Sequence, residues 1–392
     1  MIDAGQYTSG RIAIANLSAS IHSLELRRAE GAGLADLIAL SRLLLLRGDV
    51  LGRIADQDRA ELIATEAMAL SSDTATVLYM RAGLAGRFHR FDEANGLLDE
   101  ALAAGHPPGE IDRERAALLQ ATGRYEDALV LREGSAKENP GIQTLGALAS
   151  LLAEMDRWMA AENSYAAALD ADNGVSPLPC SQLLFEWGVS AMRRRDLDRA
   201  EVILAELDAV LPAHVPGRGH RAEVALARGQ LDLAATLITP LLEISDDPEY
   251  RAVYAEILAA RGDSKAASEA ERASAAYERL LARRPEAYAD HAAACFMGVS
   301  NRPQRAVELA VANRKLRDTP RSRRLLARRC TTRSKFRWCR RVPHECRQYY
   351  AYVRRSRDRR RPRWSTGRTP RRGFGRAHRP GDQLGIWRHG HQ

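Results

Sequence analysis

An all-α solenoid of antiparallel helix pairs, followed by an Arg-rich carboxyl-terminal tail, is the fold class that this 392-residue sequence predicts. The first observation behind it is a short motif, as in Gly123–Ala128, that recurs and closes on an alanine. The closing alanines stand 33, 34 or 39 residues apart: Ala94, Ala128, Ala161, Ala200, Ala234, Ala267 and Ala306. A period in this range is typical of stacked repeats, each of which can bury its apolar face only against its neighbours.

The second observation is a small residue that precedes each closing alanine by twelve positions. These residues are Ala82, Ala116, Ala149, Gly188, Ala222, Ala255 and Ala294. A small side chain on each of two helices lets their backbones approach closely, so all fourteen positions are expected to pack within helix hairpins. Gly123, Gly229 and Gly262 fall between the two markers, where a residue in the left-handed conformation would end the first helix.

The repeats resemble the tetratricopeptide repeat (TPR) over residues 74–316. A small residue is followed by Gly about seven positions later, then by an aromatic residue or Leu, then by Ala, in units near 34 residues. Some positions depart from that pattern. Arg81, Arg115 and Arg221 stand where Leu is expected, and the later alanine seen as Ala101 and Ala168 is Ser135, Leu207 or Asn313 in other units. The resemblance implies a superhelical array that binds other proteins.

The amino-terminal part is less regular. We expect residues 1–15 to be flexible and residues 16–72 to form an irregular leading repeat that caps the solenoid. Its helices are predicted over 16–28, 34–47 and 56–70, with a connector over 49–55.

The regular solenoid is predicted over residues 73–320, with about seven helix pairs. First helices are expected near 74–87, 109–122, 141–154, 178–194, 214–228, 247–261 and 286–298. Second helices are expected near 91–104, 125–136, 158–171, 197–211, 231–243, 264–283 and 303–316. Pro and Gly mark several of the breaks between them.

The tail, residues 321–392, has a composition unlike that of the body. Residues 314–392 carry a net charge of +23, whereas residues 1–313 carry −14. One interpretation is a selected basic tail. The other is a frameshift, because shifted GC-rich codons for Ala and Leu encode pairs such as Arg337-Trp338. In either case the low apolar content predicts disorder, and the charge would bind nucleic acid nonspecifically.

Motifs for catalysis, cofactors or metals are absent from the sequence. Cys330, Cys339, His344 and Cys346 do not have zinc-site spacing. The start of the chain shows no targeting signal, and no apolar run is long enough to cross a bilayer. Cys180 and Cys295 are expected to be buried thiols in the reducing cytoplasm of a bacterial-type cell.

The resemblance implies that a partner lies in the concave groove formed by the first helices. The groove positions it assigns include Tyr79, Arg113, Gln120, Gln143, Gln182, Phe185, Met192, Glu223, Glu256, Tyr288 and His291. The Lys and Asn pattern with which some TPR domains hold a carboxyl terminus is absent. The expected function is a noncatalytic scaffold for a peptide or helix. The alternatives are a nucleic-acid-associated regulator that uses the tail and an interaction subunit of an enzyme complex. The sequence specifies neither the partner nor the oligomeric state.

Overall fold

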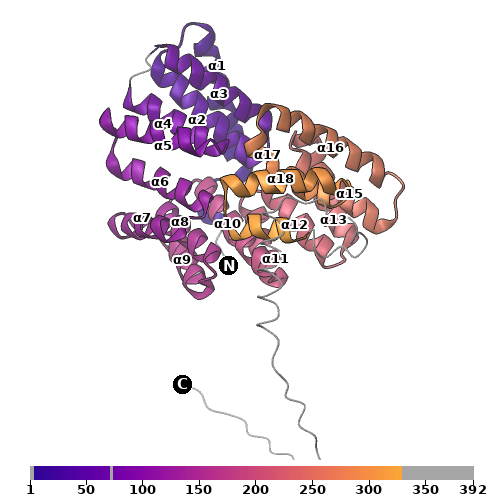
Figure 1. The fold of residues 1–392 in the computed structure, drawn as a ribbon. Coiled ribbons are helices and arrows are strands. Elements are labelled where there is room, and N and C mark those ends of the chain that lie inside the picture. The colour runs from indigo at the N-terminus through magenta and orange to yellow at the C-terminus, as the bar shows by residue number, and fades with distance from the viewer. Residues whose placement is uncertain (1–3, 71–73, 329–392) are drawn as a thin grey trace, which may run out of the picture. The chain divides into compact units, whose positions relative to one another are not determined.

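The computed structural model describes residues 4–70 and 74–328 (Figure 1). Within these ranges the regular elements are α-helices and one short 3₁₀ turn, and no strand is present. The prediction of an all-α fold built from helical repeats is confirmed. Cys330, Cys339, His344, Cys346 and nearly all of the basic tail lie outside the described residues.

Seven successive hairpins make up the body of the described chain. Their first helices are α4 (Ala75–Arg87), α6 (Pro108–Thr122), α8 (Ile142–Glu154), α10 (Pro177–Arg194), α12 (Val215–Ala227), α15 (Pro248–Arg261) and α17 (Pro285–Met297). Their second helices are α5 (Phe91–Ala103), α7 (Tyr125–Glu138), α9 (Trp158–Asp170), α11 (Leu197–Val210), α13 (Leu231–Ile238), α16 (Ala266–Arg283) and α18 (Pro303–Leu316). Each of these helices occupies one of the ranges expected from the repeat period.

One second helix is interrupted. A single helix was expected over 231–243, but α13 ends at Ile238 and a short helix, α14 (Leu241–Ile244), follows. Pro240 lies between them. Proline has no backbone N–H to donate, and its ring clashes with the preceding turn, so the helix breaks at this point.

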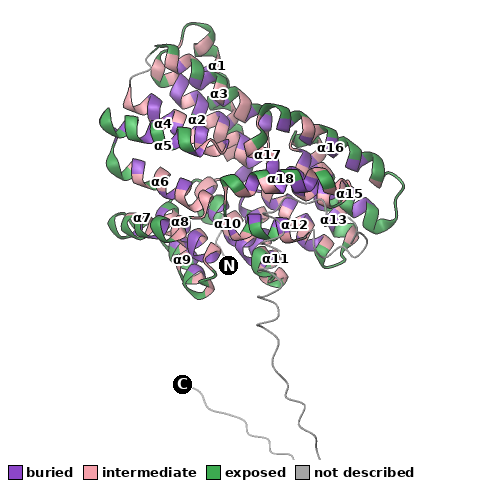
Figure 2. Cartoon of the chain, viewed as in Figure 1, coloured by how far each residue is buried: buried purple, intermediate pink, exposed green. Residues whose placement is uncertain are grey.

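The small marker residues lie mostly in the helix contacts. Twelve of the fourteen are buried. Gly188, one of the twelve, has no room for a side chain, because a Cβ there would lie 2.7 Å from Leu204 Cδ2. Ala294 is half-buried and Ala267 is exposed. Ala267 lies in the first turn of α16, and the buried side of that helix begins further along, at Ala270 and Ala273. Figure 2 shows the same division, with buried residues on the helix sides that face other helices.

The amino-terminal helices are α1 (Gly10–Ala29), α2 (Leu34–Leu51) and α3 (Ile54–Leu70). The expected flexible segment over residues 1–15 is wrong from Tyr7 onward. The Tyr7 ring is buried and its hydroxyl donates to Asp172 at 2.9 Å, while the Thr8 N–H donates to the Val175 carbonyl at 2.7 Å. Contacts with a segment 165 residues away therefore order the start of the chain.

The turn between α2 and α3 is shorter than predicted. Helix α2 continues through Gly48 and Asp49, which were expected to begin a connector, and it ends at Gly52. Gly52 takes the left-handed conformation with φ +60°, which glycine adopts without steric cost. A Cβ on Gly48 would lie 3.0 Å from the Arg53 carbonyl oxygen, so this glycine serves close packing within the turn.

Helix α19 (Pro320–Arg328) extends the fold past the expected start of the disordered tail at residue 321. Leu325 and Leu326 are buried in the cluster that contains Leu309 and Ala310 of α18. These leucines therefore cover part of the apolar surface of α18. The boundary of helical structure therefore lies at least at Arg328.

A long-range contact surface, here called the seam, joins the early helices to the late ones. Asp246, in the loop before α15, accepts hydrogen bonds from the Ile54 and Ala55 N–H groups at 2.6 and 3.0 Å. Its carboxylate thus caps the N-terminus of α3 from 191 residues away. Beside it, Arg53 Nε donates to the Ile244 carbonyl at 3.3 Å, and the Ser245 hydroxyl donates to the Gly52 carbonyl.

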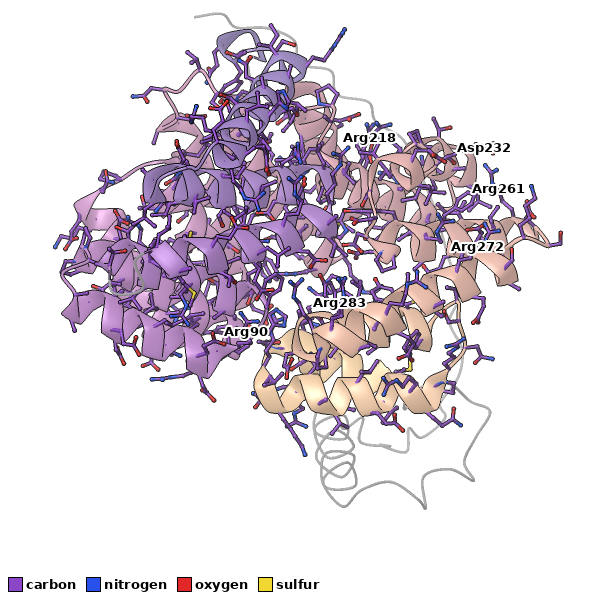
Figure 3. The ribbon with its side chains drawn as sticks, turned by 90° about the horizontal axis from the view of Figure 1, so that it is seen from above. Arg90, Arg218, Asp232, Arg261, Arg272 and Arg283 are labelled. Carbon is purple, nitrogen blue, oxygen red and sulfur yellow. The ribbon has the colours of Figure 1, made fainter. Side chains whose placement is uncertain are left out.

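The seam continues along α17 and has arginine contacts at its centre. Arg284 donates to Asp58 and, at 2.5 Å, to Glu61, and its guanidinium lies 3.7 Å from the centre of the Phe88 ring. Arg283 donates to Asp58 at 2.9 Å. Figure 1 shows α17 next to the amino-terminal helices, and Figure 3 labels Arg90, just before α5, and Arg283, at the end of α16.

The last part of the seam involves the turn between α6 and α7. Arg317 Nε donates to the Ala121 carbonyl at 3.1 Å. The carbonyl oxygen of Asp318 lies so close to Gly123 that a Cβ there would be 2.6 Å from it. Gly123 also has φ +89°, so both its conformation and its neighbour require glycine.

Candidate functional site

A cavity of about 550 Å³ lies where several first helices face the seam. Helices α4, α10, α12, α15 and α17 contribute to its wall, together with the turn between α2 and α3. Its aromatic and ionisable lining residues are Asp49, Arg87, Phe88, Phe185, Arg193, His214, His220, Glu223, Asp247, Glu249, Tyr250, Tyr277, Tyr288, His291 and Arg321. A volume of this size with apolar rings and a few polar groups is typical of ligand sites in proteins.

One side of the cavity is a stack of rings on α10 and α12. Phe185 is stacked on His220, with ring centroids 5.5 Å apart, and lies 5.3 Å from the His214 ring in a tilted arrangement. His214 caps α12, because its Nδ1 accepts the Gly217 N–H at 3.0 Å. Burial lowers the pKa of His214 to about 4, so this ring is neutral at neutral pH. His220 is paired with Glu223 at 2.6 Å; although burial lowers its pKa, this carboxylate outweighs the effect and raises it.

Another part of the wall is a charged cluster around His291. The imidazole lies 3.4 Å from Glu249 and 3.8 Å from Asp290. The Asp290 carboxylate raises the pKa of His291 to about 9, so the ring is positively charged at neutral pH. Burial opposes ionisation of Glu249, yet its contact with His291 lowers the pKa of that carboxyl to about 2. Arg321 of α19 adds a second cation 3.5 Å from Asp290.

Asp247 differs from its neighbours in this cluster. It is the N-cap of α15 and accepts the Glu249 N–H at 2.9 Å. Burial, together with the nearby Glu249 charge, raises the pKa of Asp247 to about 7.

A second cavity of about 360 Å³ adjoins the first, and Phe185, Val189 and Arg193 line both. Its wall comes from α6, α7, α8 and α10. The remaining lining residues are Ala117, Gln120, Ala121, Arg132, Ala147, Ser150, Glu154, Glu186 and Arg317.

The structure brings some of the expected groove residues together and separates others. Gln182, Phe185, Glu223, Tyr288 and His291 line the first cavity, and Gln120 lines the second. Five others line neither: Tyr79, Arg113, Gln143, Met192 and Glu256. Tyr79 is instead stacked on His106, with centroids 4.2 Å apart, and Met192 packs against the core.

Sequence reasoning missed several lining residues. Tyr250, Asp247 and His214 lie at the starts of first helices, Arg132 lies on a second helix, and Arg321 lies on α19. In the sequence, the helix starts are marked only by Pro and by residues that cap helices. No periodic signal marks Arg132 or Arg321.

The described residues contain no group of three or more His, Cys, Asp or Glu side chains arranged to hold a metal ion. Cys180 and Cys295 are both buried and free. None of the helices in the described ranges combines the length and apolar character needed to cross a membrane.

Comparison with known proteins defines the fold. No family model and no curated protein matches the chain. Among solved structures, a Rap protein complexed with Competence and Sporulation Factor aligns with 82% of this chain and 99% of its own, at 13% identity and a TM-score of 0.51. A tetratricopeptide repeat protein from Parabacteroides merdae aligns with 64% of this chain and 92% of its own, at 20% identity and a TM-score of 0.41. The APC/C hetero-tetramer Cut9–Hcn1 aligns with 84% of this chain and 64% of its own, at 15% identity and a TM-score of 0.46.

The fold is that of a tetratricopeptide-like helical solenoid. This confirms the resemblance inferred from the two small-residue markers.

Proposed function

We propose that this chain is a noncatalytic interaction scaffold that binds a short segment of another protein in the 550 Å³ cavity. The observation that carries the proposal is the convergence of five first helices on one cavity with both rings and charges in its wall. Rings such as Phe185 and Tyr288 offer rigid apolar contact, and His291 and Glu249 offer directional polar contact.

The size of the cavity limits the ligand. One turn of an α-helix with its side chains fills roughly 400–600 Å³, from a diameter of about 10–12 Å and a pitch of about 5.4 Å. The cavity therefore suits about one helical turn, or about four residues of extended peptide, and not a long helix. We infer that the partner inserts a terminus or a loop.

Two further observations support the proposal. The Rap protein of similar fold is complexed with a factor, which is an analogy at the level of fold only. The two buried free thiols, Cys180 and Cys295, suit a reducing compartment, and we place the interaction in the cytoplasm.

The test uses an equimolar library of acetylated tetrapeptide amides, incubated with the full chain and identified by mass spectrometry after size-exclusion separation. We expect a subset of peptides to be retained. Phe185→Ala should reduce their retention at least tenfold, because Phe185 lines both cavities.

The matched control is Met159→Ala on α9, whose side chain is 75% exposed and lines neither cavity. It should retain the same peptides as the unmodified chain. Retention of no peptide at all, or equal retention by the Phe185 and Met159 variants, would count against the proposal.

A further inference from the structure

The arginine at position 132 has no counter-ion among the described residues. It lies on α7, and its side chain lines the second cavity. Its Nε atom is buried without a hydrogen-bond partner, and no carboxylate in the described ranges lies within ion-pair distance of its guanidinium. Glu186 and Glu114 act on its charge only from further away.

The electrostatic environment of Arg132 sets it apart from several other arginines of this chain. Burial lowers the pKa of Arg132 and of Arg317, and both line the second cavity. In contrast, Arg284 and Arg321 have raised pKa values, since carboxylates outweigh the cost of burial. A buried cation without a partner is costly, so proteins normally pair it. Within the described residues, Arg132 is thus the arginine of this wall whose charge no ion pair compensates.

The other cations of this wall are already engaged. Arg193 is paired with Glu154 at 3.0 Å. Arg317 donates to the Ala121 carbonyl and lies 3.6 Å from Asp290. Among the described residues, the wall therefore presents one guanidinium without an ion pair, that of Arg132, and Glu186 acts on its charge from further away.

We propose that Arg132 binds one carboxylate of the bound peptide in the second cavity, while the neighbouring residues of that peptide occupy the first. This rests on the proposed function. Phe185, Val189 and Arg193 line both cavities, so a peptide that contacts these residues lies at the wall of each. A planar guanidinium matches a single carboxylate with two parallel hydrogen bonds. A dianionic phosphate fits less well, because a single guanidinium balances one negative charge and Glu186 would repel the second.

The test repeats the tetrapeptide selection with Arg132→Gln, Arg132→Lys and, as a matched control, Arg279→Gln, an exposed arginine on α16. The unmodified chain should enrich peptides with Asp or Glu at one position over the matching Asn or Gln peptides by about tenfold or more. Arg132→Gln should abolish that preference and keep the preferences at the other positions. Arg132→Lys should keep part of the preference for Asp and Glu, and Arg279→Gln should keep all of that preference.

Further arms of the library identify the source of the carboxylate. One sublibrary has free carboxyl termini without acidic side chains, and another has phosphoserine. Enrichment of the free carboxyl termini, lost in Arg132→Gln, would assign the carboxylate to a chain end and would support the proposal. Preference for phosphoserine over Asp and Glu would overturn it.

The remaining outcomes separate this inference from the proposed function. If peptides are retained without an acidic preference, the inference about Arg132 fails but the proposed function stands. The same holds if Arg132→Gln leaves an acidic preference intact. Absence of any retained peptide overturns both. A melting temperature also distinguishes binding from structure: Arg132→Gln should leave it unchanged or raise it, because an unpaired charge is removed. A marked drop would show that Arg132 is structural.

Discussion

The contacts between successive helices and the contacts of the seam differ in their chemistry. Between successive helices the contact is largely apolar, as in the cluster that runs from Ala128 on α7 to Val224 on α12. At the seam, the main contacts are charged or capping groups, namely Asp246, Arg283, Arg284 and Arg317. Its apolar part is small and includes Leu51 with Leu211, and Ile54 with Ala252.

This difference in chemistry predicts that the two kinds of contact respond differently to salt concentration. Apolar burial holds each hairpin whatever the salt concentration, whereas exposed ion pairs weaken as salt rises. The first cavity lies beside the seam, with Gly52, Ile54 and Phe88 in its wall. We therefore expect the seam to respond to salt more than the contacts within the hairpins do.

The largest effect should come from the core of a hairpin. Leu204 of α11 is 1% exposed and packs under Gly188, so Leu204→Ala should lower the free energy of unfolding by about 2–5 kcal/mol. Urea denaturation followed by circular dichroism measures it. The matching change at exposed Val202, on the same helix, should be nearly silent. Equal losses at both positions would mean that the apolar contact is not what holds the hairpin.

A smaller effect is expected for the central residue of the seam. Arg284→Ala removes the contacts with Asp58, Glu61 and Phe88 and should cost about 1–2 kcal/mol, reduced because the two carboxylates are partly exposed. Amide hydrogen exchange should speed up over residues 54–61 while exchange in α10 and α11 stays the same. High salt should have the same local effect on the unmodified chain.

Arg261→Ala provides the control for that change, because it breaks an exposed pair with Asp232 away from the seam. Exchange over 54–61 should not respond to it. Faster exchange throughout the chain in Arg284→Ala would show that the seam and the hairpins open as one unit.

The capping contact of the seam should contribute less. Asp246→Ala leaves the Ile54 and Ala55 N–H groups without their acceptor and should cost about 1 kcal/mol. The expected readout is faster exchange of the first turn of α3. Asp246→Asn should recover part of the protection, because its amide oxygen still accepts. Full protection in Asp246→Ala would show that another group caps α3.

We expect the smallest change in stability from a polar contact between successive hairpins. His291 on α17 is paired with Glu249 on α15, and its pKa is raised to about 9. A raised pKa stabilises the folded state below about pH 6.5, the ordinary value, and this stabilisation is lost as the pH rises through 9. The loss should be modest, since the side chain is 36% exposed.

Melting temperatures at pH 6.5 and 9 measure that contribution, and His291→Gln should reduce the difference between them. A ring resonance that titrates near pH 6.5 in the folded protein would contradict the assignment.

The hairpins could be predicted from the sequence because their contacts are local and repeat. Ala82 and Ala94 lie in one hairpin, and the same spacing returns in each unit. Ala267 shows the limit of this logic, since a helix with a different first turn moves its buried side by three residues. The seam could not be predicted, because Asp246 and Ile54 are far apart in sequence and neither belongs to the period.

The candidate site was predicted in part for the same reason. Phe185 and His291 lie on first helices at positions that the repeat defines, and they line the cavity. Arg132 and Arg321 reach the cavities from other helices, and their placement depends on how the array curves. Curvature accumulates from small rotations between units, and no single residue encodes it.

The Asp246 cap also has a consequence for biosynthesis. Residues 54 and 55 leave the ribosome long before residue 246 is made, since 191 residues separate Ala55 from its acceptor. At about 5–20 residues per second, this interval lasts roughly 10–40 s. During it, α3 can form but its first N–H groups can bind only water. The seam must therefore be among the last contacts of the nascent chain to form, and chaperones would meet the amino-terminal helices while their late partners are still absent.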